Sequence, residues 1–312
     1  MTIVARVPAW MNASGHDALR SAGQAHGPDT VTAPTPGIFM PARALGVVAA
    51  NRYRRRFDRH FPQAPADLSL FVCAFARYAI EWLGRTNAPY HDLEHSLVVT
   101  EVATLILEGR IAAGEAVEPE DWLAATAAAL IHDIGYVRGI CEADRGATVA
   151  IDAGQTATLS RGGTDARLAP WHISRGMLFA RERLSAVPYL DIDRLAQAIG
   201  YTRFPVPDDP AMSRNDHEPG LMRAADLIGQ LADPLYPRKV AALYAEFVET
   251  GEASRMGYRN AQDIWAGFPD FFAEQVAPHV GAARGYLSRS EEGNLWLESL
   301  ERNLALARRA SH

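Results

Sequence analysis

The chain has 312 residues, of which 48% are hydrophobic and 22% charged, and its formal net charge is −6. This length and apolar content suffice for one large globular domain, and a mixed charge pattern with a single lysine, Lys239, argues against a nucleic-acid-binding surface. The only cysteines, Cys73 and Cys141, lack the number and spacing of a disulfide framework or a cysteine metal site, so we expect a cytoplasmic protein.

Residues 1–37 are rich in Gly, Pro, Ala, Ser and Thr and have no sustained periodicity, which predicts a flexible N-terminal lead-in. Residues 38–312 are predicted to form a single helical domain. No apolar run approaches the roughly 18 residues that a membrane span requires, so no membrane association is expected.

The rest of the chain has mainly helical spacing of its apolar residues. Between Arg138 and Pro170 this pattern gives way to alternation with glycine pairs, which predicts a short β-hairpin or an ordered loop. The fold class is therefore all-α, a helical bundle with a short β-hairpin insertion. The predicted helices cover residues 41–61, 66–86, 90–115, 118–133, 170–184, 191–202, 221–234, 238–252, 261–287 and 291–309.

Two histidines, His91 and His95, lie four residues apart and so share one helix face. Such a pair alone is more often structural than metal-binding. The adjacent His132 and Asp133 end a strongly apolar helix, where both groups need partners that a divalent metal would supply. Asp226, flanked by apolar residues, pairs with a neighbouring arginine or supplies a further ligand. Two imidazoles and two carboxylates suit Zn, Fe, Mn or Mg.

The order His95, His132-Asp133, Asp226 resembles the HD-domain superfamily of metal-dependent phosphohydrolases. More particularly, "YHDLEHS" resembles the Tyr-His-Asn-x-x-His-Ala signature of class I cyclic nucleotide phosphodiesterases, and "ADLIGQLADPLYPRK" is similar to their Ala-Asp-Leu-x-Asn-Pro segment. The resemblance covers roughly residues 89–279. It implies a phosphodiesterase-like helical bundle that hydrolyses a small-molecule phosphate ester.

Residue by residue, the resemblance makes His95, His132, Asp133 and Asp226 ligands of a first divalent metal, with Asp133 bridging toward a second. His91 would be the general acid that protonates the leaving oxygen. Two metals would clamp the phosphoryl oxygens and hold a bridging hydroxide for in-line attack. His172 falls where several HD-domain proteins place a histidine near the second metal, and a capped structural histidine is its alternative role.

The departures from the family pattern concern the substrate. Asp92 replaces an asparagine, and Ile134-Gly135-Tyr136 replaces further acidic and histidine positions. Near the purine-binding glutamine of the family, this chain has Phe268, and Gln275 is displaced by two helical turns. Tyr90, Phe268 and Gln275 are the candidate pocket residues. An aromatic ring there would stack on a base or face a smaller organophosphate, so the cyclic nucleotide substrate is in doubt.

Two other function classes stay open. Some HD-domain proteins are diiron oxygenases acting on small organic substrates, typically with four histidine and two carboxylate ligands; here His172 is the obvious additional histidine, which leaves the set one short. The other class is a non-catalytic regulatory module that keeps the helical shell. The sequence leaves a homodimer open and does not identify the substrate or the native metal.

Overall fold

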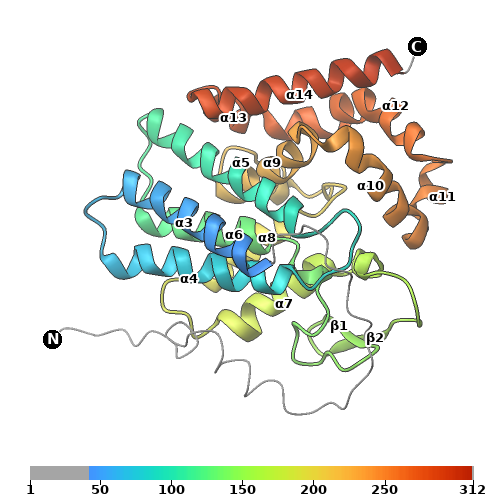
Figure 1. Ribbon diagram of the computed structural model, residues 1–312, viewed down its shortest axis with the longest axis horizontal. Coiled ribbons are helices and arrows are strands. Elements are labelled where there is room, and N and C mark those ends of the chain that lie inside the picture. The colour runs from blue at the N-terminus through green and yellow to red at the C-terminus, as the bar shows by residue number, and fades with distance from the viewer. Residues whose placement is uncertain (1–41, 311–312) are drawn as a thin grey trace.

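The computed structural model describes residues 42–310, and the lead-in predicted for residues 1–37 lies outside this range. The described chain is almost entirely helical, with one small sheet, which confirms the all-α class (Figure 1). The α-helices are α3 (Ala42–His60), α4 (Ala66–Leu83), α5 (Leu93–Ala112), α6 (Pro119–Ile131), α7 (His172–Leu184), α8 (Ile192–Tyr201), α9 (Glu218–Ala232), α10 (Tyr236–Thr250), α11 (Glu252–Met256), α12 (Ala261–Phe271), α13 (Ala277–Leu287) and α14 (Glu291–Ala310). Shorter turns are η1 (Ile134–Tyr136), η2 (Asp165–Leu168), η3 (Pro210–Met212) and the π-helical η4 (Phe272–Val276).

Helices α5 and α9 form the centre of the bundle. They pack along each other, and α6, α13 and α14 pack against both of them (Figure 1). Helix α5 is apolar around most of its circumference, as expected for a helix enclosed by neighbours on several sides. The central position of these two helices brings their polar side chains into the interior.

Gly229 of α9 lies against Val99 of α5. A Cβ atom at Gly229 would lie only 3.1 Å from the Cα atom of Val99, so the absence of a side chain allows the two helix backbones to approach closely. Gly229 is three residues beyond Asp226, and Val99 is four residues beyond His95. The close crossing therefore occurs within about one helical turn of both predicted ligands.

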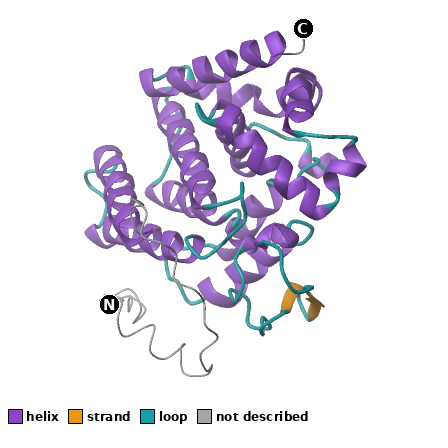
Figure 2. Ribbon diagram, turned by 45° about the vertical axis from the view of Figure 1, so that its right-hand side comes forward, coloured by secondary structure: helices purple, strands orange, loops and turns teal. Residues whose placement is uncertain are grey.

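The predicted hairpin is present. Strands β1 (Thr148–Asp152) and β2 (Gln155–Thr158) pair antiparallel, with Val149 opposite Ala157 (Figure 2). The fully buried Arg175 of α7 fixes this hairpin to the bundle. Its guanidinium donates to both carboxylate oxygens of Asp144 at 3.1 and 3.0 Å, and it also donates to the carbonyl oxygens of Ala150, Gly135 and Val137.

One predicted helix is divided. Residues 261–287 were expected to form a single helix, whereas the structure has α12, the π-helical turn η4 and α13. Pro269 lies inside α12, and Pro278 lies in the first turn of α13. Because proline has no N–H and its ring collides with the preceding turn, a continuous α-helical hydrogen-bond pattern cannot pass through both positions.

None of the helices between residues 42 and 310 is both long and apolar enough to span a membrane.

Candidate metal centre

His95 is positioned by the first turn of α5. Asp92 is the N-cap residue of this helix, and its Oδ1 atom accepts a hydrogen bond of 3.0 Å from the backbone N–H of His95. Aspartate and asparagine are equally good at this position, because both side chains satisfy a free N–H at the helix start. The aspartate that departs from the phosphodiesterase signature therefore has a structural role that asparagine also fulfils.

His132 and Asp133 follow the last turn of α6. This helix begins with a capping box between Glu118 and Asp121, and its alanine-rich body is buried against its neighbours. The Nδ1 atom of His132 lies 2.8 Å from the carbonyl oxygen of Ala129. This hydrogen bond makes Nδ1 the protonated nitrogen and leaves Nε2 with a lone pair directed to the interior.

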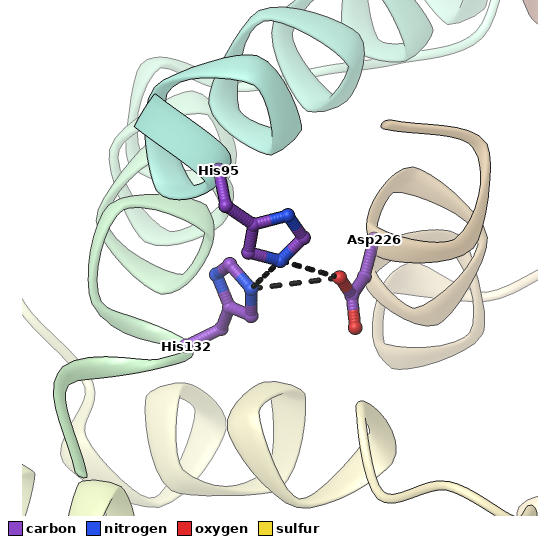
Figure 3. Close-up of side chains that lie close together, drawn as sticks. All are labelled: His95, His132 and Asp226. Carbon is purple, nitrogen blue, oxygen red and sulfur yellow. Dashed lines mark hydrogen bonds and ion pairs between the residues drawn. The ribbon is translucent and has the colours of Figure 1, made fainter. Parts of the chain in front are cut away.

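The side chains of His95, His132 and Asp226 point toward one another (Figure 3). The Nε2 atoms of His95 and His132 are 3.3 Å apart. Oδ1 of Asp226 lies 3.3 Å from Nε2 of His95 and 3.5 Å from Nε2 of His132. Oδ2 of Asp133 lies 3.3 Å from each of the two Nε2 atoms. These four side chains, called here the His–Asp cluster, come from α5, the end of α6 and α9.

The spacing of the His–Asp cluster fits a bound cation. Around a metal ion with bonds of about 2.0 to 2.1 Å, neighbouring ligand atoms lie about 3.0 to 3.4 Å apart, close to the spacings of this cluster. Oδ2 of Asp133 is buried and has no hydrogen-bond partner among residues 42–310. A divalent cation would satisfy this oxygen and two imidazole lone pairs at once.

The charges of the cluster stabilise one another. Burial by itself lowers the pKa values of His95 and His132, but Asp133 and Asp226 raise both above the ordinary value. Burial likewise raises the pKa values of the Asp133 and Asp226 carboxyls. The neighbouring imidazoles, of which His132 has the largest effect, outweigh burial and lower both pKa values below the ordinary value. A divalent cation bound here would replace protons on the imidazoles, so proton and metal would compete for the same atoms.

His91 lies beside the cluster and is held by Glu246 of α10, which the sequence analysis missed. Nδ1 of His91 is 2.6 Å from Oε2 of Glu246, whose Oε1 accepts the backbone N–H groups of Tyr90 and His91. Burial lowers the pKa of His91, but the Glu246 carboxylate outweighs it and raises the pKa to about 9. The sequence signal for this residue is a glutamate within a mostly apolar helical segment. A glutamate is rarely buried without a partner, and Glu246 is only 3% exposed.

His172 is the first residue of α7 and also lies beside the cluster. Its Nε2 atom is 3.7 Å from Oδ1 of Asp133, and its Nδ1 atom is 2.6 Å from the carbonyl oxygen of Ala169. Tyr136 stacks with both His91 and His172, with ring centroids 4.8 and 4.6 Å apart. A Cβ atom at Gly135 would overlap the carbonyl oxygen of His172, so this glycine allows the close approach.

Asp133 and Asp226 open onto a cavity of about 430 Å³. Phe268, a candidate pocket residue, lines it. Tyr90 is buried outside the lining, and Gln275 is exposed on the π-helical turn, so the geometry gives neither a place in the cavity wall. The glutamine that does line the cavity is Gln230, one turn beyond Asp226 in α9. Gln275 lies in the π-helical turn η4, where the predicted helix over residues 261–287 is divided, so the helical pattern expected for these residues does not give its direction.

The fold and the cluster together define an all-α protein with a buried histidine–carboxylate cluster that opens onto a cavity. A family model described as Npun_R2479-like matches residues 45–310, and the chain belongs to this family. A comparison with curated proteins gave no match. The family description names no activity, so the resemblance to HD-domain proteins and phosphodiesterases stays a prediction.

Proposed function

We propose that this protein is a metal-dependent phosphohydrolase that cleaves a phosphodiester of a cyclic nucleotide or a related organophosphate. The observation that carries the proposal is the His91–Glu246 pair, a proton donor of raised pKa, beside a cluster whose spacing fits a cation. Hydrolysis of a phosphate ester needs both parts, because charge develops on the phosphoryl oxygens and the leaving oxygen needs a proton.

The His–Asp cluster would hold the first metal ion. A divalent metal ion there supplies positive charge for the phosphoryl oxygens and lowers the pKa of water. Asp133 and Asp226 line the cavity and would hold the ion from that side, and His95 and His132, at 5% and 0% exposure, would hold it from the buried side. An ion held by these residues would be accessible from the cavity and shielded from solvent on its other side.

His91 would supply the proton. Because its pKa is about 9, the imidazole is protonated at neutral pH. Glu246 holds Nδ1 and thereby leaves Nε2 as the nitrogen that gives up a proton to the leaving oxygen. Glu246 is a positioning residue, since it acts on the substrate only through His91.

A second metal ion would lie on the other side of Asp133. Oδ2 of this carboxylate, 3.3 Å from Nε2 of His95, would bind the first ion, while Oδ1 lies 3.7 Å from Nε2 of His172. The Ala169 carbonyl occupies Nδ1 of His172, which leaves Nε2 available as a ligand. This geometry supports the assignment of His172 to the second ion. The same geometry fits a structural histidine capped by the Ala169 carbonyl equally well.

One observation favours a diiron oxygenase as the second candidate. The sequence alone leaves the ligand set one histidine short, whereas His91 and His172 both lie beside the cluster and both have Nδ1 occupied. A histidine bound through Nδ1 to a carboxylate is also a common metal ligand. Four imidazoles and two carboxylates would then surround two irons.

The deciding experiment combines metal analysis with hydrolysis. Purified protein is analysed for metal content, and the same sample is assayed with bis-aryl and mono-aryl phosphates under Mn, Mg, Zn and Fe. Two metals per chain with diester cleavage support the phosphohydrolase. Two irons without hydrolysis under any metal overturn it and favour the oxygenase. Asp263→Asn, in the first turn of α12 and outside the cavity lining, is the control variant.

A further inference from the structure

The part of the cavity beyond the His–Asp cluster, called here the outer cavity, has largely aromatic walls. Ring centroids of Phe204 and Phe271 are 5.5 Å apart, and those of Phe247 and Tyr258, which are stacked, are 6.3 Å apart. The walls come from the segment after α8 and from α10 to α12. The outer cavity is lined by Phe204, Phe247, Tyr258, Ile264, Phe268 and Phe271.

Four polar side chains in these walls, those of Thr202, Thr250, Glu252 and Arg255, already have partners within the fold, and Arg203, which also lines the cavity, is exposed to solvent. The hydroxyl of Thr202 donates to the carbonyl oxygen of Ile199 at 2.8 Å, and that of Thr250 donates to the carbonyl oxygen of Glu246 at 2.9 Å. Arg255 forms an ion pair with Glu252. A nucleotide base would lose water from several donors and acceptors here, and such unpaired groups are costly to bury.

Gln230 lines the cavity close to its metal-binding end. It is four residues beyond Asp226 in α9, which corresponds to about 6 Å along the helix axis. Its side chain is also a hydrogen-bond partner of the Tyr236 hydroxyl. Gln230 is therefore placed to contact groups next to the phosphoryl centre, and it does not make the outer cavity polar.

The mouth of the cavity is apolar too. Phe204 and Met256 both line the cavity and are 41% and 42% exposed, which makes them two of the large hydrophobic side chains on the surface. Exposed apolar side chains that adjoin a cavity are typical of a site that receives an apolar ligand.

We infer that the substrate is a phosphate ester whose organic group is apolar, of aryl type, and occupies the outer cavity. This inference rests on the proposed function, since it specifies the substrate class of the same site. An aryl group buries apolar surface against the rings of Phe247 and Phe268 and leaves no polar atom without a partner. The preference for aryl over nucleoside groups follows from the same walls.

The test uses the full-length, metal-loaded protein and three 4-nitrophenyl phosphodiesters. They share one leaving group and differ in the second ester group, which is methyl, phenyl or thymidin-5′-yl. We expect kcat/KM for the phenyl ester to exceed both others by about tenfold, mainly through a lower KM. Equal values for all three, or a preference for the thymidine ester, overturn the inference and leave the phosphohydrolase proposal standing.

A binding measurement separates the two proposals. 1-Naphthylphosphonate, methylphosphonate and thymidine 5′-monophosphate are titrated calorimetrically into the same metal-loaded protein. Tight binding of the naphthyl compound alone, with no hydrolysis of any diester, overturns the phosphohydrolase and supports the apolar outer cavity. Weak or equal binding of all three overturns the inference.

Substitutions at the mouth test the same point without disturbing the core. Phe204→Ser and Met256→Ser should each reduce the phenyl-to-methyl preference by about fivefold, because each removes apolar surface at the cavity. Leu306→Ser on α14 is the matched control, since Leu306 is 44% exposed and lies outside the cavity lining. An unchanged preference in both mouth variants overturns the inference.

Discussion

A single carboxylate, that of Glu246, binds both the ring and the backbone of His91. Its Oε2 atom lies 2.6 Å from Nδ1 of the imidazole, and its Oε1 atom accepts the backbone N–H of His91 at 3.1 Å. The ring is thereby fixed relative to its own main chain, and Tyr136 stacks on it at 4.8 Å. A catalytic imidazole needs such a fixed orientation if it is to meet the leaving oxygen in one geometry.

Glu246→Gln should reduce catalysis without removing the metal. In the native protein Glu246 raises the pKa of His91 to about 9 against the effect of burial, so kcat/KM should fall as pH rises through about 9. Without the Glu246 carboxylate, burial moves this fall to lower pH, against the remaining effect of Asp133 and Asp226, which also raise the pKa of His91. We expect a loss of about 10²-fold or more for alkyl leaving groups at pH 8 and a smaller loss for 4-nitrophenol. The measurement is a pH–rate profile with both substrates.

A second histidine–glutamate pair in the same chain provides the control. Nε2 of His60 lies 3.3 Å from Oε1 of Glu108, between α3 and α5. His60→Asn should leave the pH–rate profile unchanged, because this pair lies outside the cavity lining. A profile for Glu246→Gln that matches the native one would contradict the positioning role of Glu246.

Asp226→Asn should abolish tight binding of the first metal. An amide offers a weaker, neutral ligand oxygen, and two imidazoles with one carboxylate then remain. Metal content measured after dialysis should fall to near zero, and the rise of Tm on metal addition should disappear. In the native protein this rise corresponds to a stabilisation of the folded state by about 2.7 kcal/mol at a metal concentration 100 times Kd. If Asp226→Asn keeps the metal content of the native protein, Asp226 is not a metal ligand and α9 contributes no ligand to the centre.

Gly229→Ala should destabilise the protein and weaken metal binding together. Its Cβ atom would lie 3.1 Å from Val99, so α5 and α9 would be forced apart near His95 and Asp226, at a cost of about 1 to 3 kcal/mol. Gly267→Ala is the control, because Gly267 lies in α12 with open space around the added atom and should gain stability by about 0.5 to 1 kcal/mol. Urea unfolding and metal titration check both variants.

The buried ion pair between Asp144 and Arg175 should make folding stability depend on acidic pH. Burial raises the pKa of Asp144, but the Arg175 guanidinium outweighs it and lowers the pKa below the ordinary value. The stabilisation is therefore complete above about pH 3.9, where the unfolded carboxyl is ionised, and is lost as pH falls through the folded pKa. Asp144→Asn should cost about 3 to 5 kcal/mol at neutral pH and progressively less below pH 4. Urea unfolding from pH 3 to pH 7 measures the difference, and a constant difference would contradict the role of the pair.

The amino-acid sequence by itself determined the helices, the hairpin and the residues of the cluster. Apolar periodicity is a local property, and it located α4, α5 and α6 within a few residues. Histidine and carboxylate side chains in apolar helices need partners wherever they are buried, and together with the resemblance to the HD-domain ligand order this predicted that His95, His132 and Asp226 lie together, as they do in the structure. These predictions depend on residue type, on spacing and on the order of the residues along the chain.

Only the tertiary structure decided which distant residues complete the centre and where the cavity lies. Glu246 is 155 residues from His91 in sequence, and no local pattern connects them. Gly229 and Gly135 matter because of the atoms opposite them, and the aromatic outer cavity depends on how α10 to α12 and the segment after α8 come together. Such contacts are decided by close packing between helices, which the periodicity of a single helix does not encode.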